Sequence, residues 1–490
     1  IINSKTNLTD VIVNDIFSKN FSSNLLSIDL TNNGINIVGK INSYKQDLDL
    51  VWKQDFKKKN NSTSISLSGY IDEKMLNGIL KNEIKFKGKV KTEANFVGNS
   101  LDFNKGDLLL DFRDVKIESY ILDWAKPRFS SMVLKSGIIF SDNKEIDFYN
   151  FEVEGPLIQI LGDFKFKNNR LLNLNLKKFK FYSSMDNISN NLQITYTNNF
   201  SSSLELSILG DVISIGRNGL SNLLNNNGPS NNYENIIINV FFDELNSKSN
   251  LTYKNVEFSY DKKLNRLKEL SFNALLNNEP IIYGETSEHN NTKKIELFAV
   301  NFESLIDILG LNINLKGGPI KYSALIENIE GIETFSGNLN VDEFSILKLP
   351  IFAKLLNISI PNLTLDANSG IEFKKASAEI KINSKGIFIN DGVIKAKSDL
   401  PIFDNSLGMS ISGVYGFSEL TNIEGTLVPL ASINRVPSKI PFVGELFKGD
   451  NEGEGLIGIK YKIYEDKDGL IKIQSNPLSI LAPGILQRVF

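Results

Sequence analysis

The chain of 490 residues contains no cysteine and a single histidine, His289. Without cysteine it can form no disulfide, no thiolate nucleophile and no zinc–cysteine site. The lone histidine has no second imidazole with which to hold a metal, and no serine motif accompanies it. These absences argue against metal-dependent and nucleophilic enzyme chemistry.

A strong charge of one sign and long hydrophobic runs are also missing. The 54 basic and 57 acidic residues give a net charge of −3, and without a basic stripe we expect no nucleic-acid partner. No segment approaches the ~18 consecutive apolar residues that identify a membrane-spanning helix. The densest apolar run, residues 235–242, has the length of a strand.

Apolar and polar residues alternate with period two along most of the chain. Such alternation is typical of a strand with one apolar and one solvated face, and Asn-Gly, Asp-Gly and Asn-Asn pairs between the segments favour hairpin turns. Examples are Ile65/Leu67/Ile71, Ile84/Phe86/Val90, Leu172/Leu174/Leu176, Leu204/Leu206/Ile208 and Ala378/Ile380/Ile382. The sequence therefore predicts a mainly β protein with a long antiparallel sheet, and not a doubly wound α/β fold.

Helical patterns are few and short. They predict single helices between groups of strands, at Asp72–Leu80, Ser119–Ala125, Leu220–Leu224, Phe302–Leu309 and Ile351–Leu356.

The number of strands limits the architecture. One turn every ~12 residues gives roughly 30 to 40 strands, or a sheet on the order of 150 Å long at about 4.8 Å per strand. Open twisted sheets of more than ~10 strands curl, split or flatten. A sheet with one apolar face must then form a trough, sandwiches or a closed barrel, and alternation alone does not decide among these.

We find no catalytic constellation. Gly453, Gly455 and Gly458 match the spacing of a dinucleotide-binding loop, but a strand pattern follows where that motif needs a helix. The paired acids Glu452/Glu454 and Asp466/Asp468 stand in polar, turn-rich segments, unlike the acids of a glycosidase cleft. We therefore expect a protein that is not an enzyme and that uses no cofactor and no metal.

The C-terminal segment, residues 425–490, is the most distinctive part of the chain. It contains Gly425-Thr426 with Pro429, then Asn434, then Ile440-Pro441 with Gly444, then "GEGLIGIKY", and ends in "NPLSILAPGILQRVF" with Arg488 and Phe490. This segment resembles the C-terminal region of the AsmA-like family of bacterial envelope proteins. The resemblance is specific over residues 425–490, softer from residue 335, and only architectural before that.

The resemblance implies a fold, a place and a function. AsmA-like proteins are similar to bridge-like lipid transfer proteins, whose sheets curl into a long groove lined by apolar side chains. It implies a repeated β-groove region at 1–334 and an AsmA-like C-terminal region with a short apolar capping tail at 335–490. It further implies a periplasmic protein of a Gram-negative envelope, held at the inner membrane by an anchor that precedes this chain.

The implied function is a non-enzymatic conduit for phospholipids between the inner and outer membranes. Its partners would be phospholipid acyl chains, the inner membrane, and outer-membrane or periplasmic proteins. Candidate groove residues come from late alternating segments: Ile380, Ile382, Ile387, Ile389, Ile459, Tyr461 and Ile463.

Two apolar segments near the end of the chain suit a cap on the sheet or a contact with a membrane or partner. Asn476 is placed as an N-cap and Pro477 as the first residue of a short helical tail, which Pro483 interrupts. Both segments could equally plug the end of a β core without further function. The candidate residues are Ile440, Phe442, Val443, Leu446, Phe447, Leu481, Ile485, Leu486 and Phe490.

Two other functions stay open at this point. A structural envelope protein could support outer-membrane assembly without carrying lipid. An outer-membrane barrel would suit the repeated alternation and the terminal Phe490, but its strands would be longer, and Pro477 and Pro483 stand where its last strand should be.

Overall fold

The structure, a computed structural model, is mainly β, as the alternation predicts. Of the residues that it describes, 85% lie in strands and 2% in helix. It describes residues 3–476 except 17–18, 44–45, 74–83, 101, 120–123, 142–143, 169, 183–188, 200–201, 215–232, 248–250, 265, 290–291, 310–314, 330–331, 347–370, 397–406, 417–419, 430–458 and 467–470.

The chain forms two compact units. Unit 1 comprises Ile1–Val256 with Asp261–Asn265, and unit 2 comprises Glu257–Tyr260 with Arg266–Phe490. The division falls within strand β18 (Thr252–Lys263). The boundary that the resemblance implies, between residues 334 and 335, lies inside a strand of unit 2 and stays a prediction.

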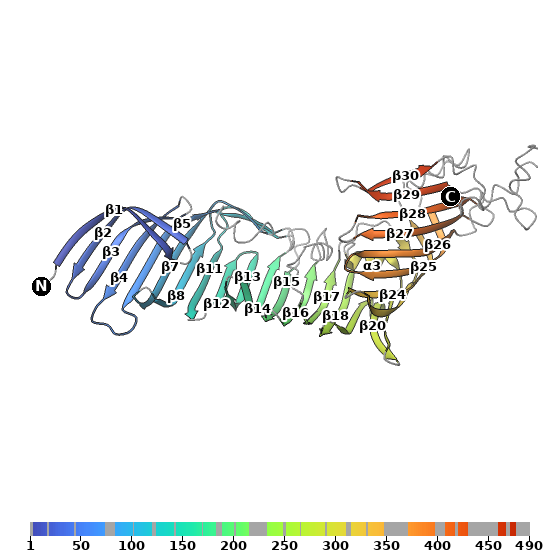
Figure 1. Cartoon of the computed structure of the whole chain (residues 1–490), viewed down its shortest axis with the longest axis horizontal. Coiled ribbons are helices and arrows are strands. Elements are labelled where there is room, and N and C mark those ends of the chain that lie inside the picture. The colour runs from blue at the N-terminus through green and yellow to red at the C-terminus, as the bar shows by residue number, and fades with distance from the viewer. Residues whose placement is uncertain are drawn as a thin grey trace, which may run out of the picture. The chain divides into compact units, whose positions relative to one another are not determined.

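Unit 1 contains one large sheet in which most neighbours in sequence pair as antiparallel hairpins (Figure 1). Its strands are β1 (Asn3–Ile16), β2 (Lys19–Thr31), β3 (Gly34–Ser43), β4 (Gln46–Asp55), β5 (Thr63–Asp72), β7 (Lys89–Asn99), β8 (Asp102–Asp111), β11 (Val133–Ser141), β12 (Glu145–Gly155), β13 (Ile158–Lys167), β14 (Arg170–Tyr182), β15 (Ser189–Asn199), β16 (Ser203–Ser214) and β17 (Asn235–Asn246). They pair in that order, β5 with β7 and β8 with β11. Among the described pairings β1 and β17 do not meet, so the sheet is open.

Two features of unit 1 depart from a simple antiparallel meander. Strands β16 and β17 pair in parallel. A separate three-stranded sheet consists of β6 (Ile84–Lys87), β9 (Lys116–Ser119) and β10 (Trp124–Lys126).

The prediction that Ile84, Phe86 and Val90 share one strand is wrong. Gly88, with φ of 133°, separates β6 from β7, so Ile84 and Phe86 belong to the small sheet and Val90 to the large one. A side chain at Gly88 would be strained at this φ, which explains why the chain changes sheets at a glycine.

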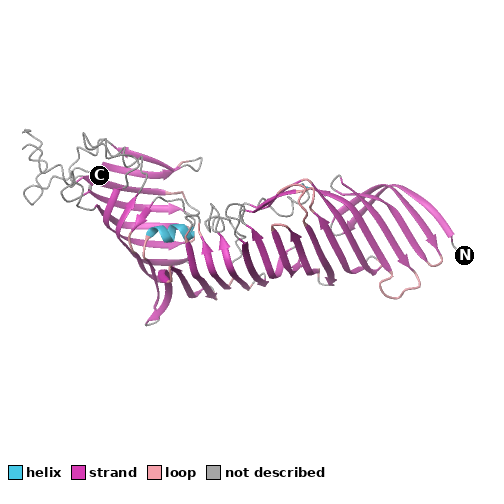
Figure 2. Ribbon diagram, turned by 180° about the vertical axis from the view of Figure 1, so that it is seen from behind, coloured by secondary structure: helices cyan, strands magenta, loops and turns pink. Residues whose placement is uncertain are grey.

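Unit 2 contains antiparallel strands and one helix, α3 (Phe302–Leu309), shown in cyan in Figure 2. Its strands are β19 (Arg266–Leu276), β20 (Glu279–His289), β21 (Thr292–Ala299), β22 (Leu315–Gly317), β23 (Ile320–Ile329), β24 (Ile332–Ile346), β25 (Ile371–Asn383), β26 (Gly386–Ala396), β27 (Leu407–Gly416), β28 (Asn422–Pro429), β29 (Ile459–Glu465) and β30 (Ile471–Asn476). They pair in chain order, except that β21 pairs with β23 and the short β22 with the end of β24. Asn277 and Asn278, both at positive φ, form the β19–β20 turn, as the Asn-Asn signal predicts.

The helix predictions have mixed outcomes. Phe302–Leu309 is confirmed as α3, where the Asn301 side chain accepts a hydrogen bond from the Ser304 amide at 2.8 Å and so caps the N-terminus. Ser119–Ala125 is wrong, because Ser119 ends β9 and Ala125 lies in β10. The other predicted helices, 72–80, 220–224 and 351–356, lie outside the described residues, apart from Asp72, which ends β5, and Glu73.

Candidate functional site: the apolar sheet faces

Strand register places apolar residues on one face of the large sheet of unit 1, which we name apolar face 1. Residues directly opposite each other on paired strands point to the same side of a sheet, so a row of partners identifies a face. One row crosses from β2 to β17 and contains only apolar residues and glycine: Ile28, Ile37, Trp52, Ile65, Phe96, Gly106, Ile138, Phe148, Phe164, Leu174, Tyr196, Leu206 and Ile238.

The adjacent row, one residue along each strand, lies on the opposite face and is mainly polar. It consists of Asp29, Asn36, Lys53, Ser64, Val97, Lys105, Ile139, Asp147, Lys165, Asn173, Thr197, Glu205 and Ile237. The two faces of this single sheet therefore differ sharply in chemistry.

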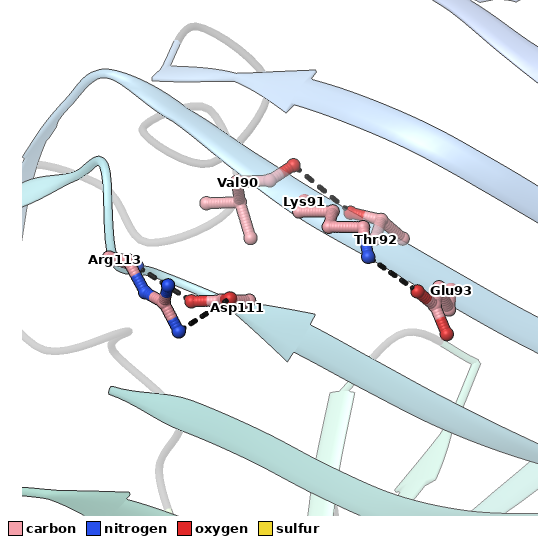
Figure 3. Close-up of polar contacts among 6 residues, drawn as sticks. All are labelled: Val90, Lys91, Thr92, Glu93, Asp111 and Arg113. Carbon is pink, nitrogen blue, oxygen red and sulfur yellow. Dashed lines mark hydrogen bonds and ion pairs between the residues drawn. The ribbon is translucent and has the colours of Figure 1, made fainter. Parts of the chain in front are cut away.

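Charged residues on the polar face pair with one another. Figure 3 shows Lys91 and Glu93, two residues apart on β7, with Nζ and Oε1 at 2.8 Å, and the ion pair of Arg113 with Asp111. The hydrogen bond with Glu93 raises the pKa of Lys91. These exposed pairs contribute little stability each, but they keep this face solvated.

Two carboxylates farther along the same face also pair with lysines. A hydrogen bond from Lys167 at 2.8 Å lowers the pKa of Glu145, and one from Lys177 at 2.9 Å lowers that of Asp163. A shallow depression of about 570 Å³ lies beside Asp147, Asp163 and Lys165.

The small sheet covers one margin of apolar face 1. The Trp124 indole N–H donates to the Leu157 carbonyl at 3.1 Å, which ties β10 to the start of β13. Val90 and Val153, at that margin, are 0% and 3% exposed, and Ile117 of β9 is also buried. Toward the opposite margin Phe148 and Phe164 are only half-buried. Within the described part of the chain, the small sheet thus covers one margin of the face, and residues toward the opposite margin stay half-buried.

Phenylalanine rings cluster toward the opposite margin. Phe148 and Phe164 stack with ring centroids 4.5 Å apart, and Phe151 and Phe166 meet Phe164 edge-on at 4.9 and 5.7 Å. Our sequence reasoning named no site residue here. The alternating Phe164-Lys165-Phe166 segment was the available signal.

Unit 2 carries an equivalent face, apolar face 2. Its central row runs from β21 to β29 and again contains only apolar residues and glycine: Ile295, Ala324, Gly337, Ile380, Ile389, Gly413, Ile423 and Ile463. Helix α3 covers one margin, where Phe302 meets Phe344 at 5.8 Å and Phe344 stacks on Phe373 at 5.2 Å.

The structure brings most of the predicted groove residues to this one face. Ile380, Ile389 and Ile463 lie in the central row, Ile382 pairs with Ile387 in the next row on the same side, and Tyr461 pairs with Gly425. Ile459 begins β29, but its side chain lies outside the described residues. All the predicted cap residues also lie outside the described residues: Ile440, Phe442, Val443, Leu446, Phe447, Leu481, Ile485, Leu486 and Phe490.

Two tyrosines on apolar face 2 donate hydrogen bonds from their hydroxyl groups to backbone carbonyls of the sheet. Tyr322 donates to the Phe335 carbonyl at 3.0 Å and Tyr461 to the Ser410 carbonyl at 2.8 Å. Burial raises the pKa of Tyr322 to about 12, and burial also raises the pKa of Tyr461. With their hydroxyl groups bonded to backbone carbonyls, both rings add apolar surface to the face.

Among the described residues, no group of three or more His, Cys, Asp or Glu side chains could hold a metal ion. No helix in the same part of the chain is long and apolar enough to span a membrane. The chain matches no family model, no curated protein and no solved structure. The resemblance of residues 425–490 to AsmA-like proteins therefore stays a prediction from the sequence.

Proposed function

We propose that the apolar faces bind the acyl chains of phospholipids and that the protein is a non-enzymatic lipid conduit of a Gram-negative envelope, related to the AsmA-like family. The observation that carries the proposal is the uninterrupted row of apolar residues and glycine on each apolar face. A charge within such a row would oppose the movement of an acyl chain, and none is present in either row.

The dimensions suit this ligand. Same-face residues on a strand are about 6.6 Å apart, so three of them span roughly 13 Å, close to the ~15 Å of half a bilayer's hydrocarbon core. Each methylene that leaves water for the face contributes about 0.8 kcal/mol. A lipid could move from strand to strand without exposing its chains, and this movement would need no catalytic residue.

A pair of variants on β26 tests the proposal. Ile389 lies on apolar face 2 and Val393 on the opposite face, where it is 42% exposed. Ile389→Lys places a hydrated ammonium in the path of the acyl chain. If a passing chain loses contact for about two methylenes, transfer between liposomes should fall about tenfold. Val393→Lys makes a comparable change on the wet face and should leave transfer unchanged.

The measurements are native mass spectrometry for copurified phospholipid and transfer of a fluorescent phospholipid from donor to acceptor liposomes. Equal transfer rates for wild type and a folded Ile389→Lys variant would contradict the conduit. If the folded wild-type protein neither copurifies with phospholipid nor transfers it, a structural envelope role without lipid carriage becomes the better explanation.

A further inference from the structure

The β4–β5 turn exposes an aromatic ring beside three consecutive lysines. Phe56 is 52% exposed, and Lys57, Lys58 and Lys59 are all exposed. Figures 1 and 2 show this turn extending past the ends of the neighbouring strands of unit 1. No other described turn of the chain has three adjacent lysines.

Hydrogen bonds hold the base of this turn. The Asp55 amide donates to the Ser62 carbonyl at 2.7 Å, and the Phe56 amide donates to the Asn33 carbonyl in the β2–β3 turn at 2.8 Å. On the other side, the Asn104 side chain donates to that of Asn61 at 3.0 Å. The exposed ring and lysines are therefore presented at a defined place on the margin of the sheet.

Residues 56–62 of the turn include no acid, and Asp29 and Asp55 line a depression beside it together with Lys53 and Lys57. The neighbouring β2–β3 turn has Asn32 and Asn33 at its tip, and the acids nearest in sequence are Asp55 and Asp49. The Asp55 carboxylate accepts a hydrogen bond from the Lys57 amide at 2.9 Å. The lysines elsewhere on the polar face largely face carboxylates, so this turn has a local excess of positive charge.

Three lysines and one exposed ring match the two components of an anionic bilayer surface. Each lysine gains about fivefold in affinity near anionic headgroups, and a phenyl ring can enter the boundary between headgroups and acyl chains. A soluble anion would use the lysines but leave the ring in water. We propose that the β4–β5 turn docks unit 1 onto a membrane surface that contains anionic phospholipid.

Docking here would place a membrane next to apolar face 1. Strands β4 and β5 meet at this turn, and they carry Trp52 and Ile65 of the apolar row on that face. Lipid entry at this point rests on the proposed function, whereas docking does not, because vesicle binding needs no transfer.

The test measures cosedimentation of the full chain with vesicles of phosphatidylcholine alone and of phosphatidylcholine mixed equally with phosphatidylglycerol. Wild type should bind the mixed vesicles, and more weakly as salt rises. K57Q/K58Q/K59Q should reduce the affinity about 100-fold, and Phe56→Ser should reduce it at both low and high salt. The matched control K87Q/K89Q/K135Q makes the same change in net charge at other exposed lysines of unit 1 and should bind like wild type.

Equal losses in the two triple variants would overturn the proposal, since they would reflect net charge rather than this turn. Unchanged binding by K57Q/K58Q/K59Q would also overturn it. The amount of phospholipid that copurifies is measured on the same variants. This second measurement distinguishes failure of the docking proposal from failure of the proposed lipid conduit. A variant that loses docking but keeps its lipid leaves the proposed function standing.

Discussion

Gly425 and Tyr461 offer a stringent test of how apolar face 2 is packed. Tyr461 is 3% exposed and lies over Gly425, its partner on β28. A Cβ added at Gly425 would clash with the Ser410 carbonyl oxygen and lie 2.6 Å from the Tyr461 hydroxyl oxygen. Because the Ser410 carbonyl also accepts the Tyr461 hydrogen bond, Gly425→Ala must disturb both the backbone contact and this bond.

The expected magnitude follows from these two effects. Overpacking a well-packed site costs about 1–3 kcal/mol, and losing the hydrogen bond costs about 1 kcal/mol, so Gly425→Ala should destabilise unit 2 by roughly 2–4 kcal/mol. Tyr461→Phe removes only the hydrogen bond and should cost about 1 kcal/mol. Since both variants lose the same bond, the double variant should be less destabilised than the sum by about 1 kcal/mol.

Hydrogen exchange of the amides in β27–β29 is the appropriate assay, because two compact units need not unfold in one transition. Gly284→Ala is the matched control, since its Cβ would meet its nearest neighbour, the Glu296 carbonyl oxygen, at 3.3 Å. It should change protection little. Protection in Gly425→Ala equal to wild type, or strict additivity in the double variant, would show that Tyr461 does not pack over Gly425 as described.

Two further predictions concern pH. Burial raises the pKa of Tyr260 and Tyr322 to about 12, so the neutral rings stabilise the fold fully below pH ~10, and this contribution is lost as pH rises from ~10 to ~12. The tyrosinate absorbance of the native protein should therefore appear at higher pH than that of the urea-unfolded chain. Coincident titration curves would contradict the burial of these rings. Hydrogen bonds from lysines lower the pKa of Glu145, Asp163 and Glu296, so their contribution to stability is present above about pH 4.5 and is lost as pH falls through the lowered values. The urea midpoint of unfolding should therefore decline in acid, and it should decline less in the triple variant E145Q/D163N/E296Q. An equal decline in that variant would show that these ion pairs do not cause the loss of stability in acid.

The sequence pattern was sufficient for features that are encoded locally. Alternation sets which side chains share a face, because the side-chain period of a strand is two. Ile380, Ile382, Ile387 and Ile389 therefore meet on one face once β25 and β26 pair as a hairpin. Helix α3 was predictable for a similar reason, since its cap at Asn301 is a neighbour in sequence.

Features that depend on distant partners were not predictable. The segment 84–90 alternates throughout, yet Gly88 sends its two halves to different sheets, because a strand pattern does not specify the strand with which it pairs. The parallel pairing of β16 with β17 is likewise a choice of partner direction. The cover over apolar face 1 depends on the bond from Trp124 to Leu157, 33 residues away, which no local pattern reveals.

The incomplete burial of the described residues of apolar face 1 is itself an argument about function. Soluble monomers rarely leave contiguous apolar patches larger than a few hundred Å² exposed. Within the described part of the chain, row residues such as Phe148, Phe164 and Leu174 are half-buried and not fully buried, so part of this face stays accessible. Among the described residues, the small sheet and α3 each cover one margin of their own face, and the ion pairs keep charge on the opposite side of the sheet. An apolar ligand that enters from the opposite margin would complete the burial of this face, and a mobile ligand such as an acyl chain would do so without fixing the site in one state.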